Sequence, residues 1–471
     1  MKNIFAKNIF KLILTGTFIV LFVPLFAENP HSFRAPMYWT VYENNFTKEQ
    51  MGIHANNYIP EDEFLANILW VEKELKPYGF TMVAMDGWGH WPHGNEHGYR
   101  TTHSIHWKHD YAWWSNFLQE RGMTLGMYDN PLWVHRTDAE IGKTIVGTDI
   151  PISSLLSNRE WSAFGFNWAQ VDRPGAEEYV KGNVHHWADM GVSYLRMDFI
   201  SWYEDGWDDN WNAGTGGWVG RRGRPREHFE TALRWIREAC DERGVFLSLV
   251  MPHLYNEGEL ELRYGHLYRI NEDFATGGWW RFSDNARGIR KRSFSQFRNA
   301  FDGFVYWSRY TGPGLAMMDG DFIRLNTFAN DEERKAVVSL NVIAGGAVTV
   351  SDQHNTIGDS LWIWQNDELL SLSREGFIGK PLSHEPDNRP WDQIWTGQAA
   401  NGDWIVALFN REGSAQVRAV NFSVHLGITD GMVRDIWAKE DLGLRRSIVA
   451  NVPARGCRIF RISAASGGDN P

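Results

Sequence analysis

Cysteine and long apolar runs are scarce in this sequence of 471 residues. Only Cys240 and Cys457 occur, too few and too far apart in the chain to indicate a disulfide framework. After an apolar run at residues 12–26, no second stretch is long enough to cross a membrane. The sequence also shows no internal repeat or low-complexity tract. These absences exclude a disulfide-stabilised small scaffold, a membrane protein with several spans and a repeat array.

Positive charge is in the minority as well. The formal net charge is −11, which argues against nucleic acid or an anionic membrane as a partner. Tryptophan, in contrast, is abundant, with 25 residues. An excess of tryptophan suits sugar-binding surfaces, where a ring stacks on the apolar face of a pyranose, although core packing also uses this residue. We therefore expect a carbohydrate partner, and the sequence does not indicate an oligomeric state.

The first 27 residues have the features of a signal peptide. Lys2, Lys7 and Lys11 form a positively charged start, residues 12–26 form the apolar core, and Ala27 is the expected cleavage residue. Leu25 fits the rule for small residues before the cut poorly, so the cleavage position stays open. We expect an exported protein, periplasmic or secreted, that is not held in a membrane after the signal is removed.

Short apolar runs alternate with longer amphipathic segments over residues 28–370. Helical patterns lie between several of these runs, at 61–76, 110–121, 176–190 and 226–243. Eight strands that alternate with helices predict an α/β fold of the (β/α)8 TIM-barrel type. The eight predicted strands are Met37–Val41, Thr81–Met85, Thr124–Tyr128, Tyr194–Phe199, Val245–Val250, Leu267–Ile270, Gly314–Met318 and Ala347–Val350.

The last hundred residues change character. Short alternating runs at 404–409, 417–422, 432–437 and 458–462 are separated by Gly, Asn and Asp. This pattern predicts a C-terminal antiparallel β-sandwich, which we place at residues 371–466, followed by a frayed tail at 467–471.

Acidic residues recur where the predicted barrel strands end. Asp198 ends a strand of aromatic and aliphatic residues, where an unpaired charge would cost several kcal/mol. Because barrels place their chemistry at the carboxyl ends of strands, we interpret Asp198 as a catalytic nucleophile; the alternative is an Asp that caps the next helix or pairs with Arg196. The residues expected to form a polar floor on this face are Asp86, Asp129, Asp198, Asp273, Asp319, Asp321 and Asp352.

Glycoside hydrolysis with retention of configuration requires a second carboxyl group about 5–5.5 Å from the first. Asp273 follows a later predicted strand and has Arg269 four residues before it. Asp284, a few residues further on, is a competing candidate. The residue types alone do not decide between Asp273 and Asp284.

Seven short motifs occur in order between residues 35 and 352. They are Ala35-Pro36-Met37-Tyr38-Trp39, Met85-Asp86-Gly87-Trp88, Leu125-Gly126-Met127-Tyr128, Tyr194-Leu195-Arg196-Met197-Asp198, Arg269 with Asp273, Gly312-Pro313-Gly314 with Gly320-Asp321-Phe322, and residues 344–351. In this order they resemble the motifs of glycoside hydrolase family 27, the family of α-galactosidases and α-N-acetylgalactosaminidases, which is related to families 31 and 36.

The resemblance implies a retaining exo-α-glycosidase of the α-galactosidase type that needs no cofactor and no metal. Asp198 would be the nucleophile, kept ionised with the help of Arg196. Asp273 would be the acid/base, kept protonated by repulsion from Asp198. The residues that the resemblance places around the sugar are Trp39, Asp86, Trp88, Tyr128, Arg196, Arg269 and Asp321.

Two departures from the family pattern affect the sugar. The family usually has a second Asp where this chain has Gly87, and a Lys where this chain has Arg196. Both positions contact the hydroxyls that distinguish galactose from other sugars. An α-galactoside, an α-N-acetylgalactosaminide, a β-L-arabinopyranoside and an α-glucoside therefore all stay open, as does a catalytically inactive sugar-binding protein.

A histidine-rich segment follows the second predicted strand. His93-Gly94-Asn95-Glu96-His97 matches the H-x-x-E-H string of some zinc peptidases, but Pro92, Gly94 and Asn95 disfavour the helix that this motif requires. We favour a long loop over the active face instead of a zinc hydrolase. Near Asp273, Trp279 and Trp280 are expected either to stack on a leaving group or to pack against a helix.

Overall fold

The computed structural model describes residues 34–50, 59–86, 93–157, 165–206, 223–312 and 314–464. The predicted signal peptide, the tail at 467–471, and Gly87, Trp88 and Pro92 lie outside the described residues. No helix in the described ranges combines the length and the apolar character needed to cross a membrane.

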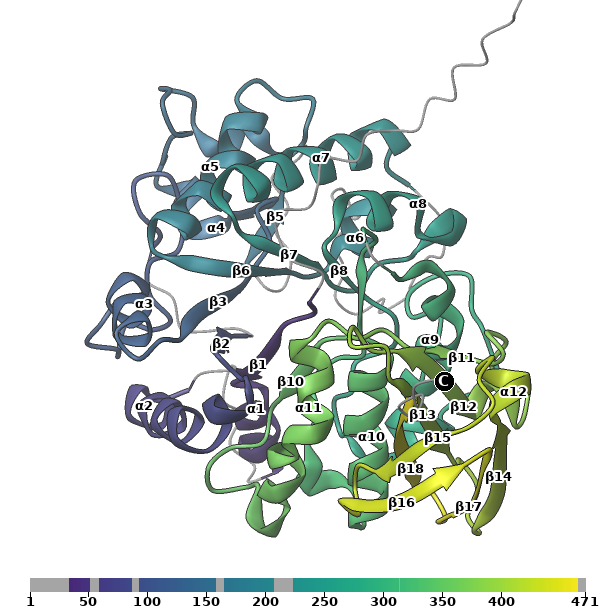
Figure 1. Cartoon of the computed structure of the whole chain (residues 1–471). Coiled ribbons are helices and arrows are strands. Elements are labelled where there is room, and N and C mark those ends of the chain that lie inside the picture. Colours follow the sequence, from purple (N-terminus) through teal and green to yellow (C-terminus); the bar gives the residue numbers. More distant parts are fainter. Residues whose placement is uncertain are drawn as a thin grey trace, which may run out of the picture.

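A parallel eight-stranded sheet forms the barrel at the centre of the molecule (Figure 1). Neighbouring strands follow the order β10-β1-β2-β3-β6-β7-β8-β9, and the ring is completed where the Ala347 amide donates to the Met318 carbonyl at 3.0 Å. All eight predicted strands are confirmed. They are β1 (Met37–Thr40), β2 (Met82–Met85), β3 (Thr124–Asp129), β6 (Val192–Met197), β7 (Phe246–Leu249), β8 (Leu267–Arg269), β9 (Met317–Asp319) and β10 (Val348–Val350).

Helices surround this barrel because each carries an apolar stripe that packs on the sheet. The helix predicted at 226–243 shows this clearly, since Phe229, Leu233 and Ile236 on one face are buried and Gly244 ends the helix in the left-handed conformation. The longer helices are α2 (Glu61–Trp70), α3 (Tyr111–Gln119), α5 (Ala176–Asp189), α7 (Arg226–Arg243), α8 (Tyr255–Tyr264), α9 (Ala300–Trp307), α10 (Asp331–Ile343) and α11 (Asp367–Arg374).

Shorter elements decorate the loops. The pattern predicted at 61–76 continues past α2 as a π-helix, Val71–Leu75, and a second π-helix spans Trp280–Asp284. A two-stranded antiparallel ribbon, β4 (Trp133–His135) with β5 (Phe166–Trp168), follows β3. The remaining α-helices of the described chain are α1 (Tyr42–Gln50), α4 (Arg136–Glu140), α6 (Ile200–Asp205) and α12 (Phe422–His425).

The C-terminal domain is the predicted antiparallel sandwich, drawn in yellow-green in Figure 1. Its larger sheet has the order β11-β12-β13-β18-β15-β16, and its smaller sheet pairs β14 with β17. Buried Val406, Leu408, Val420, Ile448 and Phe460 fill the space between the two sheets. The strands are β11 (Lys380–Pro381), β12 (Ile394–Gln398), β13 (Trp404–Phe409), β14 (Gln416–Asn421), β15 (Gly431–Asp435), β16 (Glu440–Arg445), β17 (Ser447–Val452) and β18 (Cys457–Ala464).

A fully buried arginine joins the sandwich to the barrel. Arg411, directly after β13, pairs with Asp302 of α9 at 2.6 Å and donates to the Ser283 hydroxyl at 2.9 Å. A buried ion pair is costly to break, because removing one partner leaves the other charge without compensation. The C-terminal domain therefore braces the segment that follows β8.

Candidate active site

Asp198 lies one residue beyond the carboxyl end of β6, and its carboxylate is held by two donors. The Tyr128 hydroxyl donates to Oδ2 at 2.9 Å, and the Phe199 amide donates to Oδ1 at 2.7 Å. Phe199 adopts a left-handed backbone conformation with a φ of 61°, which non-glycine residues rarely do outside strained functional loops. Only 6% of Asp198 is exposed. The sequence thus places a nearly buried, fixed carboxylate at the end of a barrel strand.

Two buried arginines lie beside this carboxylate and share one aspartate. Arg196 of β6 contacts Asp86 at 3.1 Å and Asp321 at 3.0 Å. Arg269 of β8 contacts the other oxygen of Asp321 and reaches Asp273 at 2.7 Å. We call these six residues, Asp86, Arg196, Asp198, Arg269, Asp273 and Asp321, the strand-end cluster.

The charge of Asp273 acts directly on Asp198. Burial and repulsion from Asp273, partly offset by the positive charge of Arg196, together raise the pKa of Asp198 to about 6. Arg196 acts in the expected direction, since its charge lowers the pKa of Asp198, but burial is the stronger influence. Repulsion between two carboxylates is mutual, so the pair releases its protons in two steps that belong to both groups.

Asp273 differs from Asp198 in its exposure. Surrounding protein raises the pKa of Asp273, Arg269 lowers it, and Asp321 raises it. However, 56% of the side chain is open to solvent, so solvent screening limits the increase. A bound substrate would cover this carboxyl and raise its pKa further, which is the direction that a general acid requires.

Asp86 is a second carboxyl of this cluster whose pKa is strongly raised. Burial and repulsion from Asp198 and Asp321 together raise the pKa to about 7 against the attraction of Arg196. Within the described ranges, the buried Oδ1 of Asp86 has no hydrogen-bond partner. An unpaired buried oxygen is costly, and a sugar hydroxyl would satisfy it.

The structure separates the seven predicted strand-end aspartates into groups. Asp319 supports the cluster, because its Oδ1 accepts the Asp321 amide at 2.7 Å. Asp129 and Asp352 do not join the floor: Asp129 binds Arg100 and the Trp187 indole, and Asp352 accepts the amides of residues 325 and 326. The prediction of one floor is thus wrong for Asp129 and Asp352, whose carboxylates stabilise neighbouring loops.

Trp39, which the motifs place around the sugar, and Asp284, the competing carboxyl candidate, both have structural surroundings. Trp39 has no exposed surface, lies beside Phe64 and donates to the Asp352 carbonyl at 2.8 Å, so the structure places it in the barrel wall. Asp284 accepts hydrogen bonds from the Trp279 indole and the Ser283 hydroxyl, so its carboxylate stabilises its own segment. Trp88 lies outside the described residues.

Tyr42 is a cluster neighbour that the sequence did not single out. Burial raises the pKa of its hydroxyl, and so do the charges of Asp86, Asp198 and Asp273, so the hydroxyl lies within electrostatic range of all three carboxylates. Its ring stacks on Phe322, directly after Asp321, with centroids 4.4 Å apart. The only sequence signal is its position just beyond β1, where a barrel places active-face residues.

The histidine-rich segment forms a loop over residues 93–110, as Gly94 and Asn95 predict. His93 and His97 make separate contacts: His93 lies 3.9 Å from Asp138, and His97 lies 3.1 Å from the Thr144 carbonyl. In the part of the chain that the structure describes, no group of three or more His, Cys, Asp or Glu side chains could hold a metal ion.

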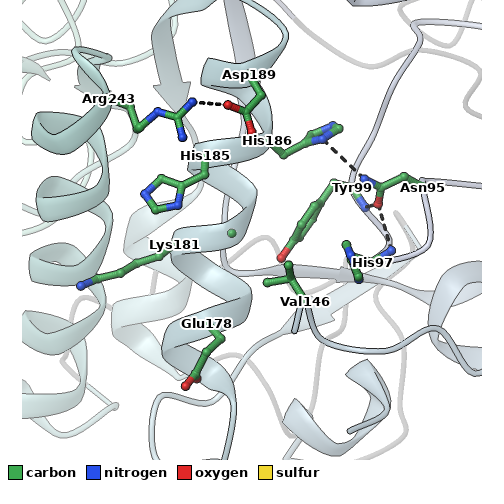
Figure 2. Close-up of a pocket in the computed structure, with 11 residues that line it drawn as sticks. Asn95, His97, Tyr99, Val146, Glu178, Lys181, His185, His186, Asp189 and Arg243 are labelled. Carbon is green, nitrogen blue, oxygen red and sulfur yellow. Dashed lines mark hydrogen bonds and ion pairs between the residues drawn. The ribbon is translucent and has the colours of Figure 1, made fainter. Parts of the chain in front are cut away.

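A depression of about 490 Å³ lies beside α5, away from the strand-end cluster (Figure 2). Asn95, Tyr99 and His186 line it, and neither Asp198 nor Asp273 does. His186 donates to the Arg100 carbonyl at 2.7 Å and thereby fastens the histidine-rich loop to α5. We therefore assign the chemistry to the strand-end cluster and not to this depression.

Known proteins match this chain over both the barrel and the C-terminal domain. A model of the alpha galactosidase C-terminal beta sandwich domain matches residues 392–462. Isomalto-dextranase of Arthrobacter globiformis is 39% identical over 452 residues, which cover 91% of this chain and 67% of the relative. The structure of the Arthrobacter globiformis T6 enzyme complexed with panose matches 92% of this chain and 73% of its own, with a TM-score of 0.83 and 37% identity.

More distant structures share the fold. The GH27 β-L-arabinopyranosidase of Geobacillus stearothermophilus gives a TM-score of 0.71 at 18% identity, covering 93% of this chain and 98% of that one. α-Galactosidase I of Mortierella vinacea gives 0.66 at 16%, covering 94% and 100%. Together with the 39% identity to the isomalto-dextranase and the match of the sandwich domain, these structures identify the family of the chain. It belongs to glycoside hydrolase family 27.

Proposed function

We propose that this chain is a retaining glycosidase that cleaves α-linked glucosyl residues from the ends of dextran-type glucans. The observation that carries the reaction is that Asp198 and Asp273, which follow strands β6 and β8 of one barrel, interact electrostatically, and that Arg269 and Asp321 join them to one buried cluster. The similarity to an isomalto-dextranase supports the glucan, the α-glucoside alternative left open by Gly87 and Arg196. The α-galactosidase activity indicated by the motifs is the second candidate, favoured by the match of the C-terminal domain.

Each carboxyl group has one role in the first step. The Asp198 carboxylate attacks the anomeric carbon, and the bond from this carbon to the glycosidic oxygen breaks. Asp273 gives its proton to that oxygen, so that the leaving sugar departs as an alcohol. Tyr128 and the Phe199 amide hold the attacking carboxylate in position.

The second step reverses these roles. The Asp273 carboxylate takes a proton from water, and the resulting hydroxide attacks the anomeric carbon and releases Asp198. Two inversions give net retention. Asp86 and Arg196 would bind sugar hydroxyls, because Asp86 offers a buried oxygen without a partner among the described residues and Arg196 holds that carboxylate in place.

A substrate panel and a labelling experiment test this proposal. Dextran and aryl α-glycosides of glucose, galactose and N-acetylgalactosamine, with an aryl β-L-arabinopyranoside, would be assayed, and NMR would record the anomer formed first. We expect turnover of the glucose substrates with retention, and labelling of Asp198 by an activated glucosyl fluoride. First-formed products of inverted configuration, or undiminished turnover in Asp198→Asn, would contradict the mechanism; faster turnover of the α-galactoside would favour the second candidate.

We also propose that the protein is exported. The charged start and apolar core of residues 1–27 support this. Cell fractionation with N-terminal sequencing of the mature protein tests it, and a chain that keeps its initial Met in the cytoplasm would contradict it.

A further inference from the structure

Trp280 differs from the other exposed tryptophans of the described chain. Four tryptophans stand out from the surface: Trp113, Trp280, Trp362 and Trp391, and Trp280 is the most exposed at 59%. Trp113 stacks on His109, Trp362 packs against Trp437, and Trp391 lies beside His425. Within the described ranges, the Trp280 ring has no aromatic neighbour and no hydrogen bond. More than half of the Trp280 surface is thus open to a ligand.

The backbone that carries Trp280 is fixed against the neighbouring loop. Gly277 and Gly278 have φ values of 68° and 74°, and the Gly278 amide donates to the Thr327 hydroxyl at 2.8 Å. A Cβ atom on Gly277 would lie 2.2 Å from that hydroxyl oxygen, so the close approach requires glycine. Arg324 adds a 2.9 Å hydrogen bond to the Ala275 carbonyl.

The chain on the C-terminal side of Trp280 is also held in place. It begins a π-helix, a local form that occurs frequently at functional sites. Within this π-helix, Phe282 and Ser283 are buried, and the Ser283 hydroxyl accepts a hydrogen bond from the buried Arg411 of the C-terminal domain. The preceding Trp279 is buried, with its indole bonded to Asp284 at 3.1 Å. Trp280 is therefore an exposed ring on a rigid base.

An ion pair places this base beside the acid/base carboxyl. Arg281, next to Trp280, contacts Glu272, next to Asp273, at 3.3 Å. The intervening turn therefore folds back, so that the residue after Trp280 meets the residue before Asp273. The segment leaves β8 at its carboxyl end, on the face of the barrel that bears the strand-end cluster.

We propose that Trp280 is the platform of a leaving-group subsite, where its indole stacks on the sugar that departs when Asp273 protonates the glycosidic oxygen. The ligand class is a neutral pyranose of an α-glucan, which the electron-rich face of an indole attracts through the sugar's C–H groups. This subsite rests on the proposed glucan-cleaving function. It extends that function by assigning recognition of the leaving group to the β8–α9 segment.

A comparison of two substrates tests the platform. Isomaltotriose has a leaving saccharide that reaches Trp280, whereas α-glucosyl fluoride releases only fluoride. In Trp280→Ala we expect the ratio of kcat/KM for isomaltotriose to that for the fluoride to fall about tenfold, and in Trp280→Phe to fall less. Trp391→Ala, an exposed tryptophan of the C-terminal domain, is the matched control and should leave the ratio unchanged. An unchanged ratio in Trp280→Ala would overturn the subsite.

Calorimetric binding separates the subsite from the reaction. Isomaltotriose would be titrated into Asp198→Asn and into the double variant that also carries Trp280→Ala. We expect about tenfold weaker binding in the double variant. Equal affinity would overturn the subsite alone. No binding to Asp198→Asn, combined with turnover of α-galactosides by the unaltered protein, would overturn the glucan assignment and the subsite with it.

Discussion

The Tyr128 hydroxyl donates a 2.9 Å hydrogen bond to Oδ2 of Asp198, and both side chains are almost completely buried. A donor stabilises a carboxylate in its ionised form and thereby lowers its pKa. This hydrogen bond therefore works against the burial that raises the pKa of Asp198 to about 6. Tyr128 thus keeps the proposed nucleophile charged at neutral pH.

Tyr128→Phe should shift the acidic limb of activity to higher pH. Loss of a hydrogen bond to a charged group costs about 1.5–3 kcal/mol, which corresponds to an upward shift of about one pH unit or more in the limb. The pH dependence of kcat/KM measures it, because it reports groups of the free enzyme. Tyr99→Phe is the matched control, since this buried tyrosine donates at 2.9 Å to the Tyr179 carbonyl. A limb that stays in place in Tyr128→Phe would disprove the role.

Asp321→Asn should damage both halves of the cluster together. Asp321 holds Arg196 with one oxygen and Arg269 with the other, and all three side chains are buried. An amide carries no charge and presents a donor to one of the arginines. We expect a loss of about 3–5 kcal/mol in the free energy of unfolding and at least a hundredfold loss in kcat/KM. Denaturant unfolding and steady-state kinetics measure the two effects.

A second buried carboxylate separates stability from activity. Asp138 pairs with Lys143 at 2.6 Å, outside the strand-end cluster. Asp138→Asn should cost comparable stability but leave kcat/KM of the folded protein near its original value. Similar kinetic losses in both variants would mean that Asp321 acts on activity only through stability.

The barrel was predictable because its signals are local. The apolar stripe of 226–243 ends at Gly244, and the helix has those same bounds. Asp86, Asp198 and Asp273 could be grouped because parallel strands bring their carboxyl ends to one face. The strands β12, β16 and β17 were not singled out; β16, for example, has no buried residue that would give an alternating apolar pattern.

The sequence did not predict which way the side chains around the cluster point. Motif position indicated that Trp39 lines the sugar site, but a strand buried on both faces gives no alternation to show which side a residue faces. Arg196 was expected beside the sugar, and the structure adds that its guanidinium is also bound by Asp86 and Asp321. Asp321 is 125 positions from Arg196, and no local pattern reveals such a bridge.

Asp273→Ala should separate acid catalysis from its effect on Asp198. Without the acid, kcat/KM for substrates with poor leaving groups should fall about 10²–10⁴-fold, while glucosyl fluoride, which needs little protonation, should lose much less. Removing the repulsion from Asp273 lowers the pKa of Asp198, so the acidic limb measured with the fluoride should move below pH 6. Asp284→Asn is the control, because that carboxyl serves Trp279 and Ser283. An upward shift of the limb in Asp273→Ala would contradict the contact.

Asp198→Asn should stabilise the protein at neutral pH and not at pH 4. The pKa of Asp198 rises from 3.8 to about 6 on folding. Ionisation of this carboxyl therefore does not lower the free energy of unfolding below pH 3.8, lowers it progressively between pH 3.8 and pH 6, and lowers it by up to about 3 kcal/mol above pH 6. Asparagine avoids this cost but loses the charge that Tyr128 and Phe199 stabilise, so 3 kcal/mol is an upper bound. Denaturant unfolding at pH 7 and pH 4 measures the difference. Asp189→Asn is the control, because this residue is 65% exposed; its free energy of unfolding should stay within about 0.5 kcal/mol of the unaltered protein at both pH values. A gain in Asp198→Asn that is equally large at pH 4 would show that the stabilisation has another origin than the buried charge.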